Sequence, residues 1–144
     1  MKVSKGMSET QPPKRSLRSF GAVVAGFFAI VILSTLTDMV LHATGVFRPL
    51  GQQMSDALFL VALAYRIVFG VAGCYITARL APGRPMWHAL VLGVIGLVVS
   101  IAGAVVMWEA GPAWYSLAVI AISMPCAWVG GRLGGMQRGA PADA

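Results

Sequence analysis

Residues 58–73 read LFLVALAYRIVFGVAG, and one arginine, Arg66, stands in the middle of this apolar run. A run this apolar predicts a helix that crosses a lipid bilayer, because roughly 20 residues span a hydrocarbon core about 30 Å thick. An arginine near the centre of such a helix costs about 2.5–3.5 kcal/mol on insertion scales. We therefore expect Arg66 to face protein or water rather than acyl chains.

The composition of the whole chain also predicts a membrane protein. Of its 144 residues, 58% are hydrophobic and only 11% are charged, and the mean hydropathy is +0.78. A soluble domain usually has roughly 25% charged residues. So few charges could not cover a globule of this size in water. We therefore predict one domain whose solvent is lipid.

Four apolar runs are long enough to cross a membrane, and glycine and proline separate them. Backbone groups in lipid must be hydrogen-bonded within their own segment, so each run is predicted to be a helix. The predicted helices are 20–45, 57–80, 86–108 and 113–133, in a transmembrane domain over 19–134. The flanking segments are predicted to be a disordered basic cytoplasmic tail, residues 1–18, and a short cytoplasmic tail, residues 135–144.

The positions of lysine and arginine predict the orientation. Nine of the 11 lie in the two tails or between the second and third helices, whereas Arg48 alone lies in the other connections. This bias predicts an antiparallel bundle in the bacterial cytoplasmic (inner) membrane with both termini cytoplasmic. Because the cations sit at the ends of apolar runs, we expect the basic tail to meet anionic lipid headgroups and do not expect nucleic acid as a partner.

The surroundings of Arg66 indicate that it faces the bundle interior. Ala62, Arg66, Gly70, Gly73 and Thr77 share one face of the second helix, and four of these five residues are small. Small residues allow helices to approach closely in lipid. Arg66 is therefore predicted on the packed side of its helix.

The predicted partner of Arg66 is Asp38 in the preceding helix. Counting from the outer ends at 1.5 Å per residue places Asp38 about 10 Å deep and Arg66 about 15 Å deep, a difference that a guanidinium side chain spans. His42 and Ser34 lie four residues after and before Asp38, so they share its face. The candidate intramembrane polar site is Asp38, His42, Arg66 and Ser34.

Two interpretations of this polar site stay open. In the structural one, Arg66 and Asp38 neutralise each other and hold the first hairpin in register. In the functional one, Asp38 and His42 exchange protons, or Arg66 binds an anion that enters from outside. The second interpretation describes a small oligomeric transporter or channel for a proton-coupled solute or an anion.

Small residues in the third predicted helix define a candidate helix-packing face. They recur at alternating intervals of four and three residues, which keeps them on one side of a helix. A groove or gating seam is the functional alternative to simple packing. The residues are Ala89, Gly93, Gly96, Ser100 and Gly103.

The sequence has no spacing typical of a metal site, a nucleophilic centre or a phosphate-binding loop. Cys74 and Cys126 both lie in apolar runs, where unpaired cysteines usually act as small buried hydrophobes. We therefore predict no metal, no cofactor and no enzymatic activity. An accessory or interaction protein is expected, and a homo-oligomer is compatible with the pattern.

Several short motifs resemble those of small hypothetical four-helix bacterial membrane proteins over roughly residues 20–134. The motifs are Thr37-Asp38, Leu63-Ala64-Tyr65-Arg66, Ala78-Arg79-Leu80-Ala81-Pro82, His88-Ala89 with Leu92-Gly93, Trp114-Tyr115 and Pro125-Cys126-Ala127. The resemblance implies a compartment and a fold but no substrate. The chain is also similar to small multidrug-resistance transporters, which have four helices and an acid in the first. Here that acid is matched by Arg66, a departure that disfavours proton-coupled export of cations.

Overall fold

The structure is a computed structural model that describes residues 13–49 and 52–139. Within these residues the chain is all-helical, and its four long helices are each long and apolar enough to cross a membrane. The number and type of elements predicted from the sequence are confirmed. The helices are α1 Pro13–Ala43, α2 Asp56–Leu80, α3 Pro85–Val106 and α4 Ala113–Met136, with a short 3-10 helix, η1 Trp108–Ala110, before α4.

Two helices extend beyond the predicted bounds. Helix α1 begins at Pro13, so residues 13–18 are helical and not part of a tail. Proline suits a first helical turn, and the straight-chain residues that follow it favour helix. Because these residues are polar, a prediction based on the length of the apolar run did not include them. Helix α4 continues to Met136 because its late glycines pack against α2. The remainder of the predicted tails, residues 1–12 and 140–144, lies outside the described residues.

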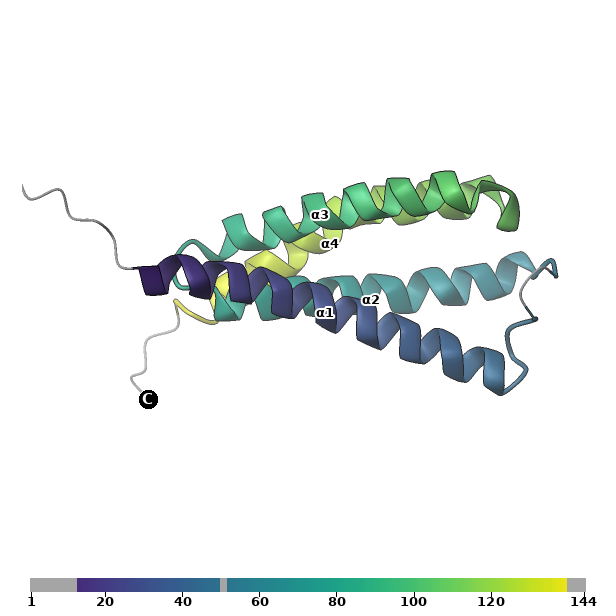
Figure 1. The fold of residues 1–144 in the computed structure, drawn as a ribbon, viewed down its shortest axis with the longest axis horizontal. Helices are drawn as coiled ribbons and strands as arrows, with labels where there is room; N and C mark the ends of the chain where they lie inside the picture. Colours follow the sequence, from purple (N-terminus) through teal and green to yellow (C-terminus); the bar gives the residue numbers. More distant parts are fainter. Residues whose placement is uncertain (1–12, 50–51, 140–144) are drawn as a thin grey trace, which may run out of the picture.

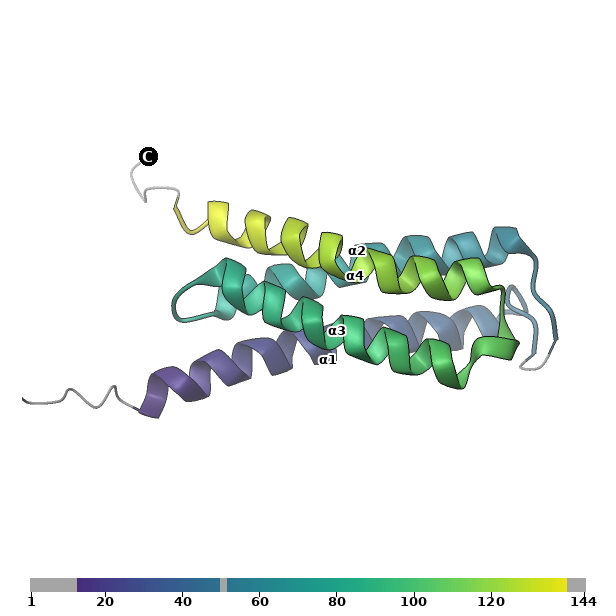
Figure 2. The ribbon, with the colours of Figure 1, turned by 90° about the horizontal axis from the view of Figure 1, so that it is seen from above.

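The molecule has two different ends (Figures 1 and 2). The start of α1, the 81–84 connection and the end of α4 lie together at one end. We call this the basic end, after the cations Lys14, Arg15, Arg18, Arg79, Arg84, Arg132 and Arg138. At the opposite end lie η1 and the described parts of the connection after α1, residues 44–49 and 52–55, and α1 diverges from α3 and α4 toward this end (Figure 1). We call this the wide end.

Glycines bring α1, α2 and α4 into backbone contact in the half nearer the basic end. A Cβ added to Gly73 would lie 2.8 Å from the carbonyl oxygen of Gly26 on α1. A Cβ added to Gly130 would lie 2.5 Å from the carbonyl oxygen of Val71 on α2. No side chain fits at such distances, so both crossings require glycine. This is the close approach expected of helices that pack in lipid.

Helices α2 and α4 form one of the two largest interfaces, and they run in the same direction. Gly70 lies against Cys126, and the Cβ of a residue at Gly134 would lie 2.6 Å from Ala78. Both pairs are separated by 56 residues, so contacts along the two helices advance in step. The sequence predicted contact between the first two helices but did not predict this pairing of α2 with α4.

A small core and a set of polar bonds complete the half nearer the basic end. The core is the cluster Cys74, Ala78, Ala89, Leu92 and Ala127. Both cysteines are buried and free, as predicted. The fully buried Thr77 donates a hydrogen bond to the carbonyl oxygen of Ala22 at 3.1 Å, which ties α2 to α1. This half is therefore joined by backbone and small side chains.

The segment after α4 is bonded to the end of α2. Arg138 donates hydrogen bonds to the backbone carbonyls of Arg79 and Ala81. Tyr75 donates to the side-chain oxygen of Gln137. The last carbonyls of a helix have no partner within it, so Arg138 supplies the donors that α2 lacks at its C-terminus.

Candidate functional site

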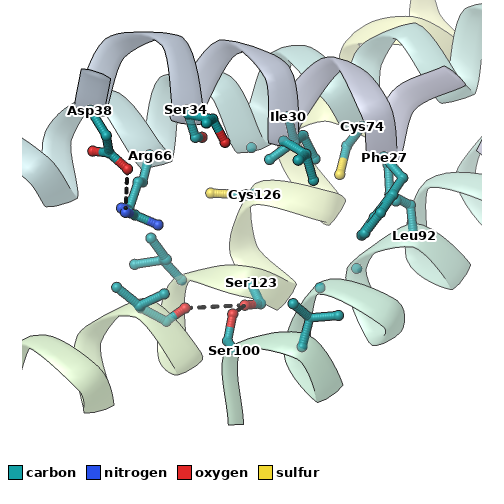
Figure 3. A pocket seen from close by; sticks show the side chains of 18 residues that line it. Phe27, Ile30, Ser34, Asp38, Arg66, Cys74, Leu92, Ser100, Ser123 and Cys126 are labelled. Atoms are coloured by element: carbon teal, nitrogen blue, oxygen red, sulfur yellow. Dashed lines mark hydrogen bonds and ion pairs between the residues drawn. The ribbon is translucent and has the colours of Figure 1, made fainter. Parts of the chain in front are cut away.

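The site contains the ion pair that the sequence predicts. Nη2 of Arg66, on α2, lies 3.1 Å from Oδ2 of Asp38, on α1 (Figure 3). Both side chains are about one-third exposed, at 35% and 33%. The distance is that of a charge-assisted hydrogen bond, and the contact joins the two helices where they have begun to separate.

The second carboxylate oxygen of Asp38 has a partner that was not predicted. The hydroxyl of Tyr65, also on α2, donates a hydrogen bond to Oδ1 of Asp38. Consecutive residues of a helix point about 100° apart, so an argument based on the face of Arg66 did not select its neighbour. The available signal in the sequence was that Tyr65 is the immediate neighbour of the charged Arg66. Asp38 is thus held by two consecutive residues of α2.

His42 and Ser34 do not extend this cluster as predicted. Nδ1 of His42 lies 2.8 Å from the backbone carbonyl oxygen of Asp38, one turn earlier, and the ring packs edge-on against Phe47. The imidazole therefore bonds the backbone of Asp38 and not its carboxylate. Ser34 lines the nearby cavity, but among the described residues it has no hydrogen bond to Asp38. Of the candidate polar site, the structure thus brings together Asp38 and Arg66, whereas neither His42 nor Ser34 bonds to the carboxylate of Asp38 in the part of the chain that the structure describes.

A cavity of about 280 Å³ lies between the four long helices, next to the ion pair (Figure 3). Asp38 and Arg66 line it together with Ser34, and the hydroxyls of Ser100 and Ser123 lie 3.5 Å apart in its wall. Most of the remaining lining is apolar. The ion pair is therefore both a contact between α1 and α2 and part of a cavity wall.

The predicted packing face of α3 is correct in one half only. Ala89 and Gly93 are buried and lie against Gly131 and Ala127 of α4, and Ser100 meets Ser123. Among the described residues, no atom beyond the adjacent backbone of α3 lies within 4 Å of where a Cβ of Gly96 or Gly103 would be. Gly96 lines the cavity, and Gly103 is exposed. The contacts of this face with α4 are therefore made at Ala89, Gly93 and Ser100, and they do not include Gly96 or Gly103.

A separate contact joins α2 and α4 at the wide end. Nε1 of Trp114 donates a hydrogen bond to Oδ1 of Asp56 at 3.2 Å. Phe59 packs against the rings of Trp114 and Tyr115, with centroids 6.4 and 5.0 Å apart. The sequence did not predict this contact. It keeps α2 and α4 together where α1 departs.

The described residues contain no group of three or more His, Cys, Asp or Glu side chains suited to hold a metal ion. Comparison with known protein families, curated proteins and solved structures found no match to this chain. The described residues thus form an all-helical protein whose four long helices are each long and apolar enough to cross a membrane. Asp38, Tyr65 and Arg66 form a polar cluster between α1 and α2.

Proposed function

We propose that this chain is a non-enzymatic, multi-pass protein of the bacterial cytoplasmic membrane in which Asp38, Tyr65 and Arg66 hold α1 against α2. The observation that carries the proposal is the double engagement of Asp38, by Tyr65 at Oδ1 and by Arg66 at Oδ2. The role that fits such a unit is accessory: a compact membrane scaffold for interaction with other components.

The proposed topology is an antiparallel four-helix arrangement with both termini cytoplasmic. Seven described cations lie at the basic end, whereas the described acids Asp38, Asp56 and Glu109 all lie elsewhere. Cytoplasmic loops carry an excess of lysine and arginine. The basic end would also contact anionic lipid headgroups, because each nearby cation contributes about 1 kcal/mol at such a surface.

The energetic argument for a structural role concerns what a broken pair leaves behind. Removing one partner of a buried ion pair costs about 3–5 kcal/mol, because the other charge stays without compensation. Here both side chains are about one-third exposed, so we expect a smaller loss of stability than this range. Removing both charges together should recover much of it.

A double-mutant cycle tests this role. We expect Asp38→Asn and Arg66→Gln each to lower accumulation in membranes and resistance to unfolding in detergent, and the double variant to recover both. Lys14→Gln is the matched control, because it removes one cation from the polar first turn of α1. Normal accumulation of both single variants would contradict the structural role.

A second candidate function is transport of an anion or a proton-coupled solute, and the position of the ion pair in the cavity wall favours it. Purified protein in proteoliposomes would then show a pH-dependent flux. Single variants that accumulate normally but lose this flux would establish transport in place of the accessory role.

A further inference from the structure

The cavity is elongated, and its two ends differ chemically. Its α1 lining runs from Phe27 to Asp38, which is about 16 Å along a helix. Phe27 and Leu92 line the end nearer the basic end of the molecule, and the ion pair lines the other (Figure 3). A molecule that fits this space has an apolar body and a polar head next to Arg66.

The polar end of the cavity has more hydrogen-bond donors than acceptors. A guanidinium carries five N–H groups, and Asp38 accepts from Nη2 alone. Nε of Arg66 is buried and has no hydrogen-bond partner among the residues that the structure describes. Because Nε is closed to the cavity, the donors that an acceptor in the cavity can reach are the N–H groups of the two Nη atoms, on a side chain that is about one-third exposed.

The charge of the site selects among possible heads. Asp38 already neutralises Arg66, so an anionic head would bring an uncompensated charge into an apolar space, which is costly. A cationic head would be repelled by the guanidinium of Arg66 and would compete with it for Asp38. An uncharged acceptor, such as a carbonyl oxygen, meets neither penalty.

We propose that the cavity binds an elongated apolar molecule with one uncharged carbonyl-type acceptor, whose oxygen accepts a hydrogen bond from Arg66 and whose tail extends toward Phe27 and Leu92. The volume of about 280 Å³ lies just below the range typical of small-molecule pockets, about 300–1,000 Å³. This inference goes beyond the proposed function, and the part of that proposal that it requires is the packing of the four helices around the cavity.

The test uses 2-undecanone labelled with ¹³C at the carbonyl, added to the purified full-length protein in detergent micelles. We expect a saturable shift of the carbonyl resonance that empty micelles do not give. Unlabelled 2-undecanone, undecane, undecanoate and undecylamine are the competitors of matched length. The ketone should bind about tenfold more tightly than the alkane, as expected for one hydrogen bond to a charged donor.

Two glycines of α3 supply a matched pair of variants. Gly96 lines the cavity, whereas Gly103 does not, and an added Cβ meets no atom within 4 Å at either position. Gly96→Leu should fill the cavity and weaken ketone binding at least tenfold, while Gly103→Leu should leave binding unchanged. Gly96→Val replaces the larger variant if Gly96→Leu lowers accumulation.

Arg66→Lys separates the acceptor contact from the ion pair. Lysine keeps a cation for Asp38 but removes the planar guanidinium with its additional N–H donors, so we expect ketone binding to fall about tenfold and alkane binding to stay the same. Absence of a saturable shift, unchanged binding by Gly96→Leu, or stronger competition by undecanoate or undecylamine than by unlabelled ketone would each overturn the proposal. A chain that passes the double-mutant cycle but fails here loses this inference alone.

Discussion

The basic end and the wide end use different means to hold the same helices together. Near the basic end, backbone meets backbone at Gly26, Gly73 and Gly130. Toward the wide end, the contacts between α1 and α2 are side-chain hydrogen bonds to Asp38. Apolar burial contributes little between helices in lipid, so contact requires either close backbones or polar pairs. In this protein the close backbone contacts lie near the basic end, and the polar pair between α1 and α2 lies toward the wide end.

The largest expected effect is at the basic end. Gly130→Leu places a side chain where Val71 and Cys74 of α2 leave no space, so α4 must move away from α2. We expect a loss of about 1–3 kcal/mol or more, as for overpacked cores, measured by unfolding in detergent and by accumulation. Gly103→Leu is the control and should behave as the unmodified protein. Equal stability of the two variants would show that glycine contact is not what holds this end.

A smaller effect is expected from the polar cluster. Tyr65→Phe removes one hydrogen bond to Asp38 while keeping the ring and the ion pair. We expect a loss of about 0.5–1.5 kcal/mol, and up to about 3 because the acceptor is charged, in the same unfolding assay. Tyr75→Phe removes a hydroxyl of the same type near the basic end and provides the matched control. A larger loss from the control would contradict the importance of the cluster.

The smallest effect is expected where α2 meets α4 at the wide end. Trp114→Phe keeps an aromatic ring beside Phe59 but loses the hydrogen bond to the exposed Asp56. We expect a loss of about 0.5–1.5 kcal/mol or less, because water competes for an exposed carboxylate. Asp56→Asn keeps an acceptor oxygen and should lose less. A loss exceeding that of Gly130→Leu would reverse the comparison between the two ends.

The sequence predicted the features that depend on one helix or on depth along it. Helix number and type follow from segment length and hydropathy, and the pairing of Arg66 with Asp38 follows from counting residues inward from each outer end. The features that it missed depend on how helices rotate and cross. Tyr65 could be placed on Asp38 only once the rotation of α2 was known.

Two wrong predictions share this cause. The packing face of α3 is regular in the sequence, but Gly103 has no neighbour in the described part of the chain, because the points of close approach depend on how α3 and α4 cross. Similarly, His42 lies on the same face as Asp38, but its ring turns to the backbone one turn below instead of the carboxylate. Shared helical faces predict direction and do not predict contact.

The bonds of Arg138 to the end of α2 have a mechanical consequence. Together with the hydrogen bond between Trp114 and Asp56 at the opposite end, they attach α2 to α4 at both ends. We therefore expect α2 and α4 to move as one rigid unit. Helix α1 is attached to this unit where Gly26 crosses Gly73 and where Asp38 contacts α2. Any large motion of the protein is therefore expected to be a swing of α1 about the crossing, with release of Asp38 as the step that permits it.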